Sequence, residues 1–270
     1  MATETGTGNT DSTDAAAPRI KAATPGVEKA IWGPWQTVGF GAAIFSCSMA
    51  AQSAVAIAFF VLKMAANPAG GLPDFASLAS NGAVISFAIL ASTIAGVGVT
   101  YVFIGLRRGA GFKDYLGLTG ITGKTVIVLL GATAALIAVS EGADTLFAKS
   151  GNTRFMIDAY ESSGSPLLLG VALVVFAPAF EEIFFRGFLF VGLTPSRIGP
   201  ARTILLTAVI WSMLHIQYDL FGMATILVMG IFLGIVRFKT GSLWSTLLIH
   251  SFWNLVAVVE TGLVVNGIIN

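Results

Sequence analysis

Long apolar runs recur along this chain almost to its C-terminus, and they constrain the fold more than any other feature. A run of about 18 to 20 apolar residues is long enough to cross the hydrocarbon core of a bilayer as a helix. Of the 270 residues, 55% are hydrophobic and only 11% are charged, whereas soluble domains carry roughly 25% charged residues. The sequence therefore predicts an all-α polytopic membrane protein built as a bundle of spanning helices.

Hydropathy, together with the positions of Gly, Pro and charged residues, divides the apolar part into about seven predicted spans. Their approximate ranges are 36–62, 82–106, 125–147, 165–193, 201–217, 220–236 and a seventh from 242 onward. Residues 256–269 either extend the seventh span or form a short eighth one. Residues 1–30 are rich in Thr, Ala, Gly and Asp, which predicts a disordered cytoplasmic tail. We interpret residues 31–270 as one membrane-embedded domain.

The charges between the predicted spans indicate an orientation. Basic residues gather on one side of such a bundle, and they are Arg107, Arg108, Lys113, Lys124, Arg197, Arg202, Arg237 and Lys239. The positive-inside rule then places the N-terminus in the cytoplasm. The formal net charge is only +1, and phosphate binding needs clustered Lys and Arg outside the membrane. We therefore expect the lipid bilayer, and no nucleic acid, as a partner.

Three charged residues lie inside the fourth predicted span: Glu181, Glu182 and Arg186. Because a charge at the centre of a spanning helix costs about 2.5 to 3.5 kcal/mol, such residues need a partner or a function. Glu182 and Arg186 are four residues apart, so they share a helix face in the order that favours pairing. Glu181 then points elsewhere without a local partner. Pro178 lacks a backbone N–H and is expected to kink the helix nearby.

The two histidines of the sequence, His215 and His250, both fall in predicted spans. Trp211 lies one turn before the first, and Asn254 lies one turn after the second. At 1.5 Å per residue from the cytoplasmic helix ends, Glu181, the histidines and the asparagine lie roughly 12 to 21 Å deep. We therefore expect them to meet in one cavity. A carboxylate and an imidazole there suit a general base that activates water, and an imidazole and an amide can donate to an oxyanion.

Each of these residues also has a structural interpretation when it is taken singly. A buried His or Asn often makes an interhelical hydrogen bond. We interpret the Glu182–Arg186 pair as structural, and Gly230 with Gly234 as a small-xxx-small pattern for helix packing. Asp219 is interpreted as a loop residue rather than as the partner of the nearby histidine. The coincidence of all these groups is what favours a functional site.

Three motifs, in order, resemble those of the type II CAAX prenyl proteases and their bacterial relatives, the abortive-infection or bacteriocin-processing (CPBP) intramembrane proteases. Glu181–Arg186 resembles the EExxxR motif, Trp211–His215 the FxxxH motif and His250–Asn254 the HxxxN motif. This core covers about residues 165–257, in spans four to seven. The resemblance implies an intramembrane endopeptidase of a prokaryotic inner membrane that acts on a membrane-associated protein or peptide.

The resemblance also implies a role for each motif residue. Glu181 with His215 would activate the hydrolytic water, and His250 with Asn254 would stabilise the oxyanion. Glu182 and Arg186 would support the site. Trp211 stands where the family usually has Phe, which keeps an aromatic ring there and bears on the size of the cavity.

Zinc is an alternative for this site. Glu181, His215 and His250 can in principle supply the three ligands of an open catalytic zinc site, although the sequence has no HExxH element. We favour a glutamate mechanism that requires no cofactor. A non-proteolytic immunity or scaffold protein, with a polar core for helix packing, is the alternative function. A transporter is a third option, because intramembrane charges also mark ion paths.

Overall fold

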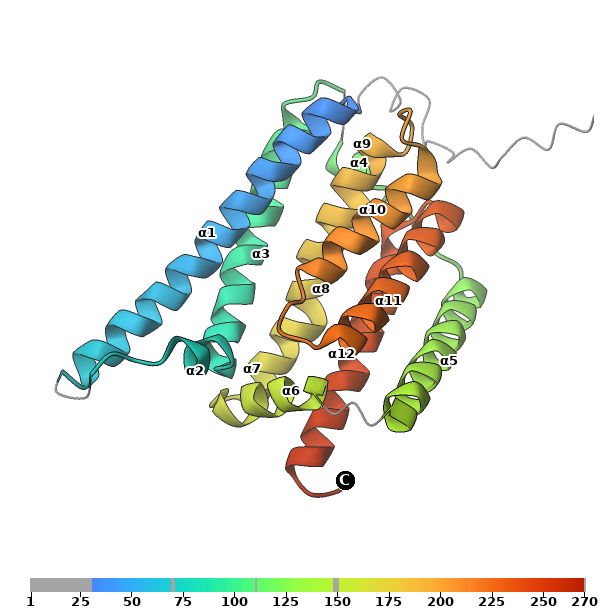
Figure 1. Ribbon diagram of the computed structural model, residues 1–270. Helices are drawn as coiled ribbons and strands as arrows, with labels where there is room; N and C mark the ends of the chain where they lie inside the picture. Colours follow the sequence, from blue (N-terminus) through green and yellow to red (C-terminus); the bar gives the residue numbers. More distant parts are fainter. Residues whose placement is uncertain (1–30, 69–70, 110, 148–150, 270) are drawn as a thin grey trace, which may run out of the picture.

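The computed structural model describes residues 31–68, 71–109, 111–147 and 151–269 of the chain (Figure 1). These residues form helices, turns and loops, and no strand occurs among them. The predicted all-α class is therefore confirmed. The tail predicted at residues 1–30 lies outside the described part.

Six of the predicted spans correspond to helices that are long and apolar enough to cross a membrane. Five of these are single helices: α1 (Pro34–Ala66), α3 (Gly82–Gly105), α5 (Gly123–Phe147), α11 (Leu220–Thr240) and α12 (Leu243–Val265). The sixth runs from Pro166 to Leu193. Three short helices connect or cover them: α2 (Phe75–Ala79), α4 (Phe112–Leu116) and α6 (Gly151–Ser162). The chain is therefore an integral, multi-pass membrane protein.

The fifth predicted span, 201–217, is corrected by the structure. It is α10 (Gly199–Met213), a helix of 15 residues, which at 1.5 Å per residue is about 22 Å long and shorter than the roughly 30 Å hydrocarbon core. The chain then turns, and Asp219 starts α11 by accepting a hydrogen bond from the Gly222 backbone N–H at 2.8 Å. Because this cap fixes the start of α11, the intervening residues form a link and do not extend α10.

The end of the chain resolves the alternative that hydropathy left open. Helix α12 continues without interruption to Val265, so the described residues contain no separate eighth helix. In Figure 1 the C-terminus lies at the opposite end of the bundle from the start of α1. The six full-length spans and the short α10 run along the bundle in alternating directions. The described chain therefore begins and ends at opposite ends of the bundle.

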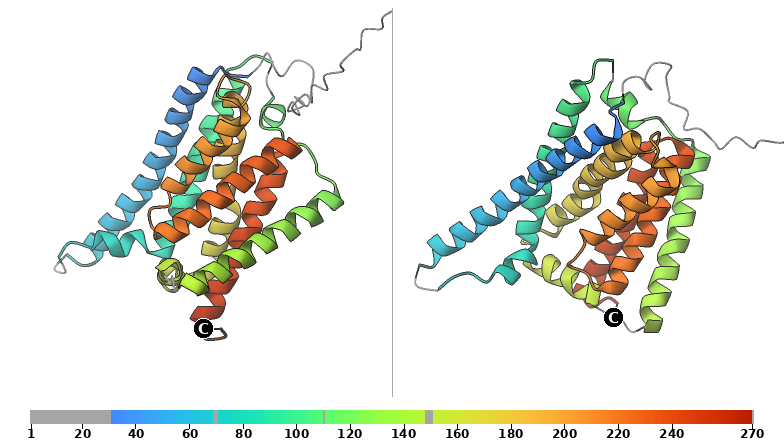
Figure 2. Two further views of the ribbon diagram at one scale, coloured as in Figure 1. Left: turned by 45° about the vertical axis from the view of Figure 1, so that its right-hand side comes forward. Right: turned by 45° about the horizontal axis from the view of Figure 1, so that its top comes forward.

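The helix that runs from 166 to 193 occupies the centre of the bundle. The pair α1 and α3 lies on one side of it, α10, α11 and α12 lie on the other, and α5 packs outside against α12 (Figures 1 and 2). Small residues let the neighbours approach closely: a Cβ added at Gly192 would lie 2.0 Å from Thr37 Oγ1 of α1. A Cβ at Gly96 of α3 would lie 2.1 Å from the Phe180 ring.

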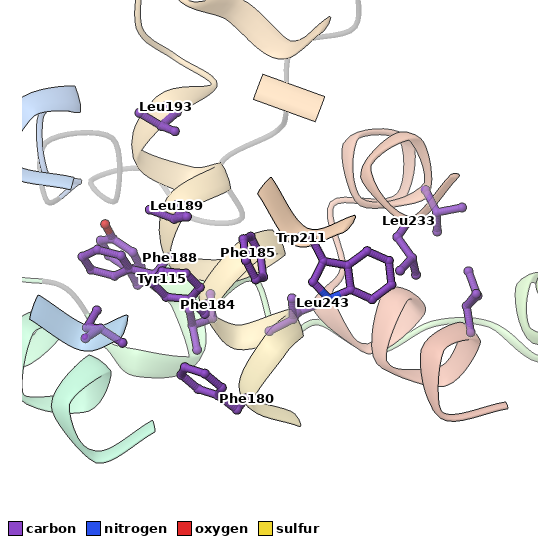
Figure 3. Packing of buried hydrophobic residues seen from close by; sticks show 14 of the residues in the cluster. Tyr115, Phe180, Phe184, Phe185, Phe188, Leu189, Leu193, Trp211, Leu233 and Leu243 are labelled. Atoms are coloured by element: carbon purple, nitrogen blue, oxygen red, sulfur yellow. The ribbon is translucent and has the colours of Figure 1, made fainter. Parts of the chain in front are cut away.

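The central helix is divided into five segments. They are α7 (Pro166–Val171), the π-helical η2 (Ala172–Phe176), α8 (Ala177–Glu181), the π-helical η3 (Glu182–Leu189) and α9 (Phe190–Leu193). Short π-helical insertions inside α-helices are frequent at functional sites. The aromatic residues of η3 pack into the hydrophobic core, which Figure 3 shows around Phe184, Phe185 and Phe188. Segment η3 therefore carries both aromatic core residues and the charged residues Glu182 and Arg186.

Candidate active site

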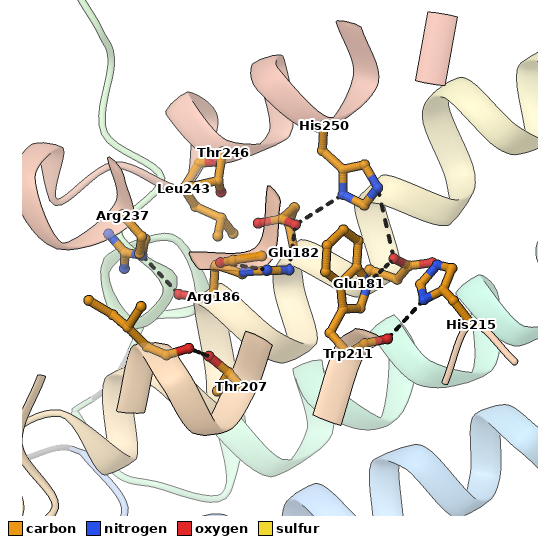
Figure 4. Close-up of polar contacts among 12 residues, drawn as sticks. Glu181, Glu182, Arg186, Thr207, Trp211, His215, Arg237, Leu243, Thr246 and His250 are labelled. Atoms are coloured by element: carbon orange, nitrogen blue, oxygen red, sulfur yellow. Dashed lines mark hydrogen bonds and ion pairs between the residues drawn. The ribbon is translucent and has the colours of Figure 1, made fainter. Parts of the chain in front are cut away.

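Glu182 and Arg186 form an ion pair in the interior of the bundle, as their spacing predicts. Arg186 Nη1 donates to Glu182 Oε1 at 3.0 Å, and both side chains are fully buried (Figure 4). Arg186 Nη2 also donates to the Gly230 carbonyl of α11 at 3.2 Å. The guanidinium lies 4.6 Å from the centre of the Trp211 ring, a distance typical of a cation–π contact. These contacts fix η3 against α10 and α11.

Arg237 contributes to this network, although the sequence pattern indicates only a topological role for it. Its Nε donates to the Arg186 backbone carbonyl at 2.8 Å, and its Nη2 donates to the Leu116 carbonyl of α4 at 2.9 Å. Arg237 is 4% exposed, so its guanidinium makes these contacts in the interior of the protein. The only signal in the sequence is its position six residues before the start of α12, and this does not distinguish it from a surface arginine.

Glu181 is the carboxylate that remains accessible. Its side chain is 23% exposed, whereas that of Glu182 is fully buried. Trp211 Nε1 donates to Glu181 Oε2 at 2.5 Å, and His250 Nε2 lies 3.9 Å from the same oxygen. Glu181 has no partner within its own helix. Its partner is the indole of Trp211, which lies in α10.

His250 lies between the two glutamates (Figure 4). Its Nδ1 is 3.0 Å from Glu182 Oε1. An ionised carboxylate paired with Arg186 can only accept, so Nδ1 carries the proton and Nε2 faces Glu181. The 3.9 Å separation exceeds hydrogen-bond length, and a water molecule is the usual bridge across such a gap.

His215 lies outside the helix in which the sequence places it. Helix α10 ends at Met213, and His215 is in the link to α11. Its Nδ1 is 2.8 Å from the Trp211 carbonyl, which can only accept, so Nδ1 is again the protonated nitrogen. The Trp211 ring stands edge-on to both histidines, with centroids 5.1 Å from His215 and 5.2 Å from His250. Within the described chain no hydrogen bond or ion pair joins Glu181 to His215.

Tyr218 is a site neighbour that the motifs did not reveal. Its ring lies parallel to that of His215, at 6.2 Å and 9°, and stands edge-on to Phe155 of α6 at 5.8 Å. Burial, and then the charge of Glu181, raise the pKa of Tyr218 to about 12, so it remains a phenol at neutral pH. Its spacing of three residues from His215 was the available signal. Asp219 caps α11, which confirms its interpretation as a loop residue.

Asn254 is directed at the central helix. Its Nδ2 donates to the Leu173 carbonyl in η2 at 2.8 Å. The sequence predicts an amide that donates to an oxyanion, and in this arrangement one of the two N–H groups of the amide donates to a backbone carbonyl. The glycine prediction is confirmed: a Cβ at Gly230 would lie 3.1 Å from Ala208 Cα, and one at Gly234 would lie 2.9 Å from Ile204 Cγ2 of α10.

The residues present do not form a zinc site in this arrangement. Across the described ranges, no group of three His, Cys, Asp or Glu side chains is placed to hold one metal ion. Both histidines use Nδ1 for other hydrogen bonds, which leaves Nε2 of each ring as the atom able to bind a metal. A catalytic zinc site needs three protein ligands at about 2.0 to 2.2 Å for nitrogen and oxygen. The reaction proposed below uses Glu181 and its neighbouring side chains.

Comparison with known proteins points to a protease family. Residues 163–256 match the family model described as type II CAAX prenyl endopeptidase, Rce1-like. The matched segment contains all three motifs and every residue named above from α8, η3, α10 and the first half of α12. No curated protein and no solved structure matches the chain.

Proposed function

Because the chain belongs, through residues 163–256, to the CPBP family of type II CAAX-type membrane proteases, we propose that it is an intramembrane endopeptidase. Its substrate would be a membrane-associated protein or peptide, whose scissile bond lies close to the lipid. The bilayer confines such a substrate to the depth at which the site lies.

The observation that carries this proposal is the environment of Glu181. It is a partly exposed carboxylate that accepts from the Trp211 indole and lies 3.9 Å from His250 Nε2. The adjacent Glu182 is buried and neutralised by Arg186. Glu182 thus has a structural role. Glu181 is the carboxylate that water can reach, as a general base must be.

In the proposed reaction, Glu181 takes a proton from a water molecule while the water oxygen bonds to the carbonyl carbon of the scissile peptide. The carbonyl becomes a tetrahedral oxyanion. Glu181 then gives its proton to the peptide nitrogen, the C–N bond breaks, and a new carboxylate and a free amine are released.

The oxyanion requires a donor near the carbonyl. We propose that Nε2 of His250 supplies this donor, in an orientation that the 3.0 Å contact between its Nδ1 and Glu182 fixes. His215, beside Trp211 on the accessible side, is the second candidate donor through Nε2. The fixed Nδ1–H contacts of both rings determine how each Nε2 is aimed.

The charged loops support an orientation for this reaction. The basic residues between the helices gather at the end of the bundle where α1 begins and α9 meets α10. By the positive-inside rule this end faces the cytoplasm, with the N-terminus. We place the protein in a prokaryotic inner membrane, with the substrate entering from the cytoplasmic side.

A Glu181→Gln variant tests the proposal. The amide cannot act as a base, so cleavage of a prenylated peptide ending in a CAAX sequence should fall by about 10² to 10⁴-fold. The same exchange at the exposed Glu161 of α6 should leave cleavage unchanged. Comparative membrane proteomics of both variants would identify peptide termini that arise only with an active Glu181. A folded Glu181→Gln protein that retains full cleavage would support the scaffold alternative.

A further inference from the structure

A groove separates α5 from α11 at one end of the bundle. Helix α5 lies at the outside of the bundle and packs mainly against α12 (Figures 1 and 2). In the halves toward the other end, α5 and α11 meet where Ser140 Oγ donates to Thr225 Oγ1 at 3.5 Å. Toward the start of α5 and the end of α11, the two helices leave a cavity of about 300 Å³. The groove is lined by Lys124, Val128 and Leu129 of α5 and by Val236 and Lys239 of α11, with one threonine from each helix.

The groove lies at the end of the bundle that the positive-inside rule assigns to the cytoplasm. The loop that leads into α5 is fixed to the turn between α11 and α12. Ser242 Oγ donates to the Thr119 carbonyl at 2.5 Å, and the Leu243 N–H donates to the Gly117 carbonyl at 2.9 Å. These contacts hold the start of α5 beside the end of α11. The groove therefore faces the cytoplasmic leaflet, in which anionic lipids create a negative surface potential.

The mouth of the groove carries two positive charges from different helices, Lys124 and Lys239. Both side chains are exposed, and within the described ranges neither takes part in an ion pair. None of the described residues that line the groove is acidic. Two ammonium groups that face one cavity repel each other, and a phosphate group that accepts from both relieves this repulsion. The mouth of the groove is therefore complementary to an anion.

The wall of the groove deeper in the bilayer is apolar. Val128 lies one turn into α5 from Lys124, and Val236 lies one turn back along α11 from Lys239. Leu129 and Val236 are buried, whereas Val128 is 60% exposed and contacts the bilayer. An anionic head at the mouth and an apolar tail along the wall describe a phospholipid. Basic pockets between spanning helices on the cytoplasmic side are typical sites for anionic lipid headgroups.

We propose that this groove binds one anionic phospholipid of the cytoplasmic leaflet. Its phosphate lies between Lys124 and Lys239, and an acyl chain lies along Val128, Leu129 and Val236. A zwitterionic lipid carries an amine as well as a phosphate, and the groove offers that amine no carboxylate. The bound lipid fills the space between α5 and α11 and so joins α5 to the rest of the bundle. This site is separate from the proposed cleavage reaction and does not depend on it.

Native mass spectrometry of the full chain in detergent measures this binding directly. Titration with phosphatidylglycerol should yield one tightly bound lipid per protein, and phosphatidylcholine should bind more weakly. The double variant Lys124→Gln with Lys239→Gln should bind phosphatidylglycerol about 10- to 30-fold more weakly, because it loses two charges that face the phosphate. Its binding of phosphatidylcholine should change much less. Equal binding of phosphatidylglycerol by the wild type and this double variant would overturn the proposal.

Two further variants separate a lipid site from general electrostatic attraction. Arg197→Gln with Arg202→Gln is the matched control, since it removes the same charge from two exposed residues outside the groove. It should leave phosphatidylglycerol binding unchanged. Val128→Trp fills the groove without a change of charge and should weaken binding roughly tenfold, which is equivalent to removing about two methylene groups from the wall. Equal losses in the control and in the lysine variant would show that only the overall charge matters.

Thermal unfolding gives a second measurement that does not involve cleavage. Phosphatidylglycerol should raise the unfolding midpoint of the wild type by about 2 to 6 °C and that of the lysine double variant by much less. Equal midpoints of the two proteins without lipid would show that the variant is folded. Millimolar inorganic phosphate should give no such shift, and a shift as large as that with phosphatidylglycerol would reduce the site to an anion site. Displacement of the bound lipid by a prenylated peptide would identify the substrate as the occupant and overturn the proposal.

Discussion

Trp211 donates its indole N–H to the Glu181 carboxylate over 2.5 Å, although the two residues are thirty positions apart in the sequence. A hydrogen bond to an ionised group is stronger than one between neutral groups. It also stabilises the carboxylate without the full neutralisation that Arg186 gives to Glu182. The aromatic position of the second motif therefore does more than fill space, since a phenylalanine there has no N–H to donate.

The first prediction concerns this indole. Trp211→Phe keeps an aromatic ring between the histidines but removes the donor to Glu181, so kcat/KM should fall by about tenfold, in line with a charge-assisted hydrogen bond of 1.5 kcal/mol or more. Steady-state cleavage of the prenylated peptide measures it. Trp244→Phe, which changes a half-exposed tryptophan of α12, is the control. Equal activity of the two variants would show that the indole N–H is not used.

Substitutions of the two residues of the buried ion pair, Glu182 and Arg186, should have coupled effects on the stability of the protein. Arg186→Leu leaves Glu182 charged and unpaired in the interior, which should destabilise the protein by about 3 to 5 kcal/mol. The double variant with Glu182→Leu should be less destabilised than the sum of the single variants. Thermal unfolding in detergent provides the comparison.

The exposed pair formed by Arg154 and Asp158 is the natural reference for that experiment. It has the same i,i+4 spacing but exposed side chains, at 81% and 39%. Arg154→Gln should therefore change stability by no more than about 0.5 kcal/mol. Equal effects of Arg154→Gln and Arg186→Leu would contradict the assignment of the inner pair to the structural core.

Two glycines of α3 should differ sharply when changed to alanine. A Cβ at Gly96 would lie 2.1 Å from the Phe180 ring, whereas no atom lies within 4 Å of a Cβ at Gly98. Gly96→Ala should displace Phe180 together with the adjacent Glu181, lower cleavage and cost about 1 to 3 kcal/mol. Gly98→Ala should retain activity and gain up to about 1 kcal/mol from helix propensity. Similar behaviour of the two variants would argue against this close contact.

Alkaline pH should reveal the environment of Tyr218. Its pKa is raised from 10.0 to about 12 by burial and by the charge of Glu181. Between these pH values the folded protein keeps the phenol proton that the unfolded chain loses. The contribution of Tyr218 to stability is thus fully present below about pH 10 and is lost as the pH rises through 12.

Ultraviolet titration of the phenolate is the measurement for this group. Tyr218→Phe should leave the absorbance change below pH 10 the same as in the wild type and should remove part of the loss of stability above it. Burial also raises the pKa of Tyr115 in α4, so Tyr115→Phe is a useful comparison. A smaller absorbance change below pH 10 in Tyr218→Phe would show that this phenol is accessible.

Metal removal should not affect cleavage. The described side chains do not gather three ligands around one point, and the proposed reaction uses Glu181 with an imidazole. Activity should therefore survive prolonged treatment with a chelator. The decisive measurement is the metal content of active protein before and after this treatment. About one equivalent of zinc, lost together with activity and restored with it, would overturn the metal-free mechanism.

The sequence predicted those features that depend on local spacing. The i,i+4 order of Glu182 and Arg186 predicted their pairing, and it forms at 3.0 Å. The apolar runs predicted the spanning helices, because length and composition alone decide whether a segment can cross a bilayer. Of the residues expected to meet Glu181, His250 lies 3.9 Å from its carboxylate, whereas His215 and Asn254 hydrogen-bond to backbone carbonyls instead. Trp211, which was not among them, donates to Glu181.

Features that depend on backbone register or on tertiary contacts could not be predicted. Hydropathy cannot show that α10 stops at Met213, since the apolar residues Leu214 and Ile216 follow it directly. Hydropathy also cannot predict the two π-helical segments. One of them, η2, places the Leu173 carbonyl opposite Asn254. The partners of Arg237 are backbone carbonyls, which every residue has, so no sequence pattern marks them.

The short α10 has a consequence for the bilayer around the protein. At about 22 Å it is roughly 8 Å shorter than the hydrocarbon layer, and its outward residues Leu205, Leu206, Ile210 and Met213 are exposed. A hydrophobic mismatch of this kind is relieved when the lipid thins next to the short element. The thinned region would lie beside His215, which follows α10. Lipid headgroups and water would therefore come nearest to Glu181 on this flank.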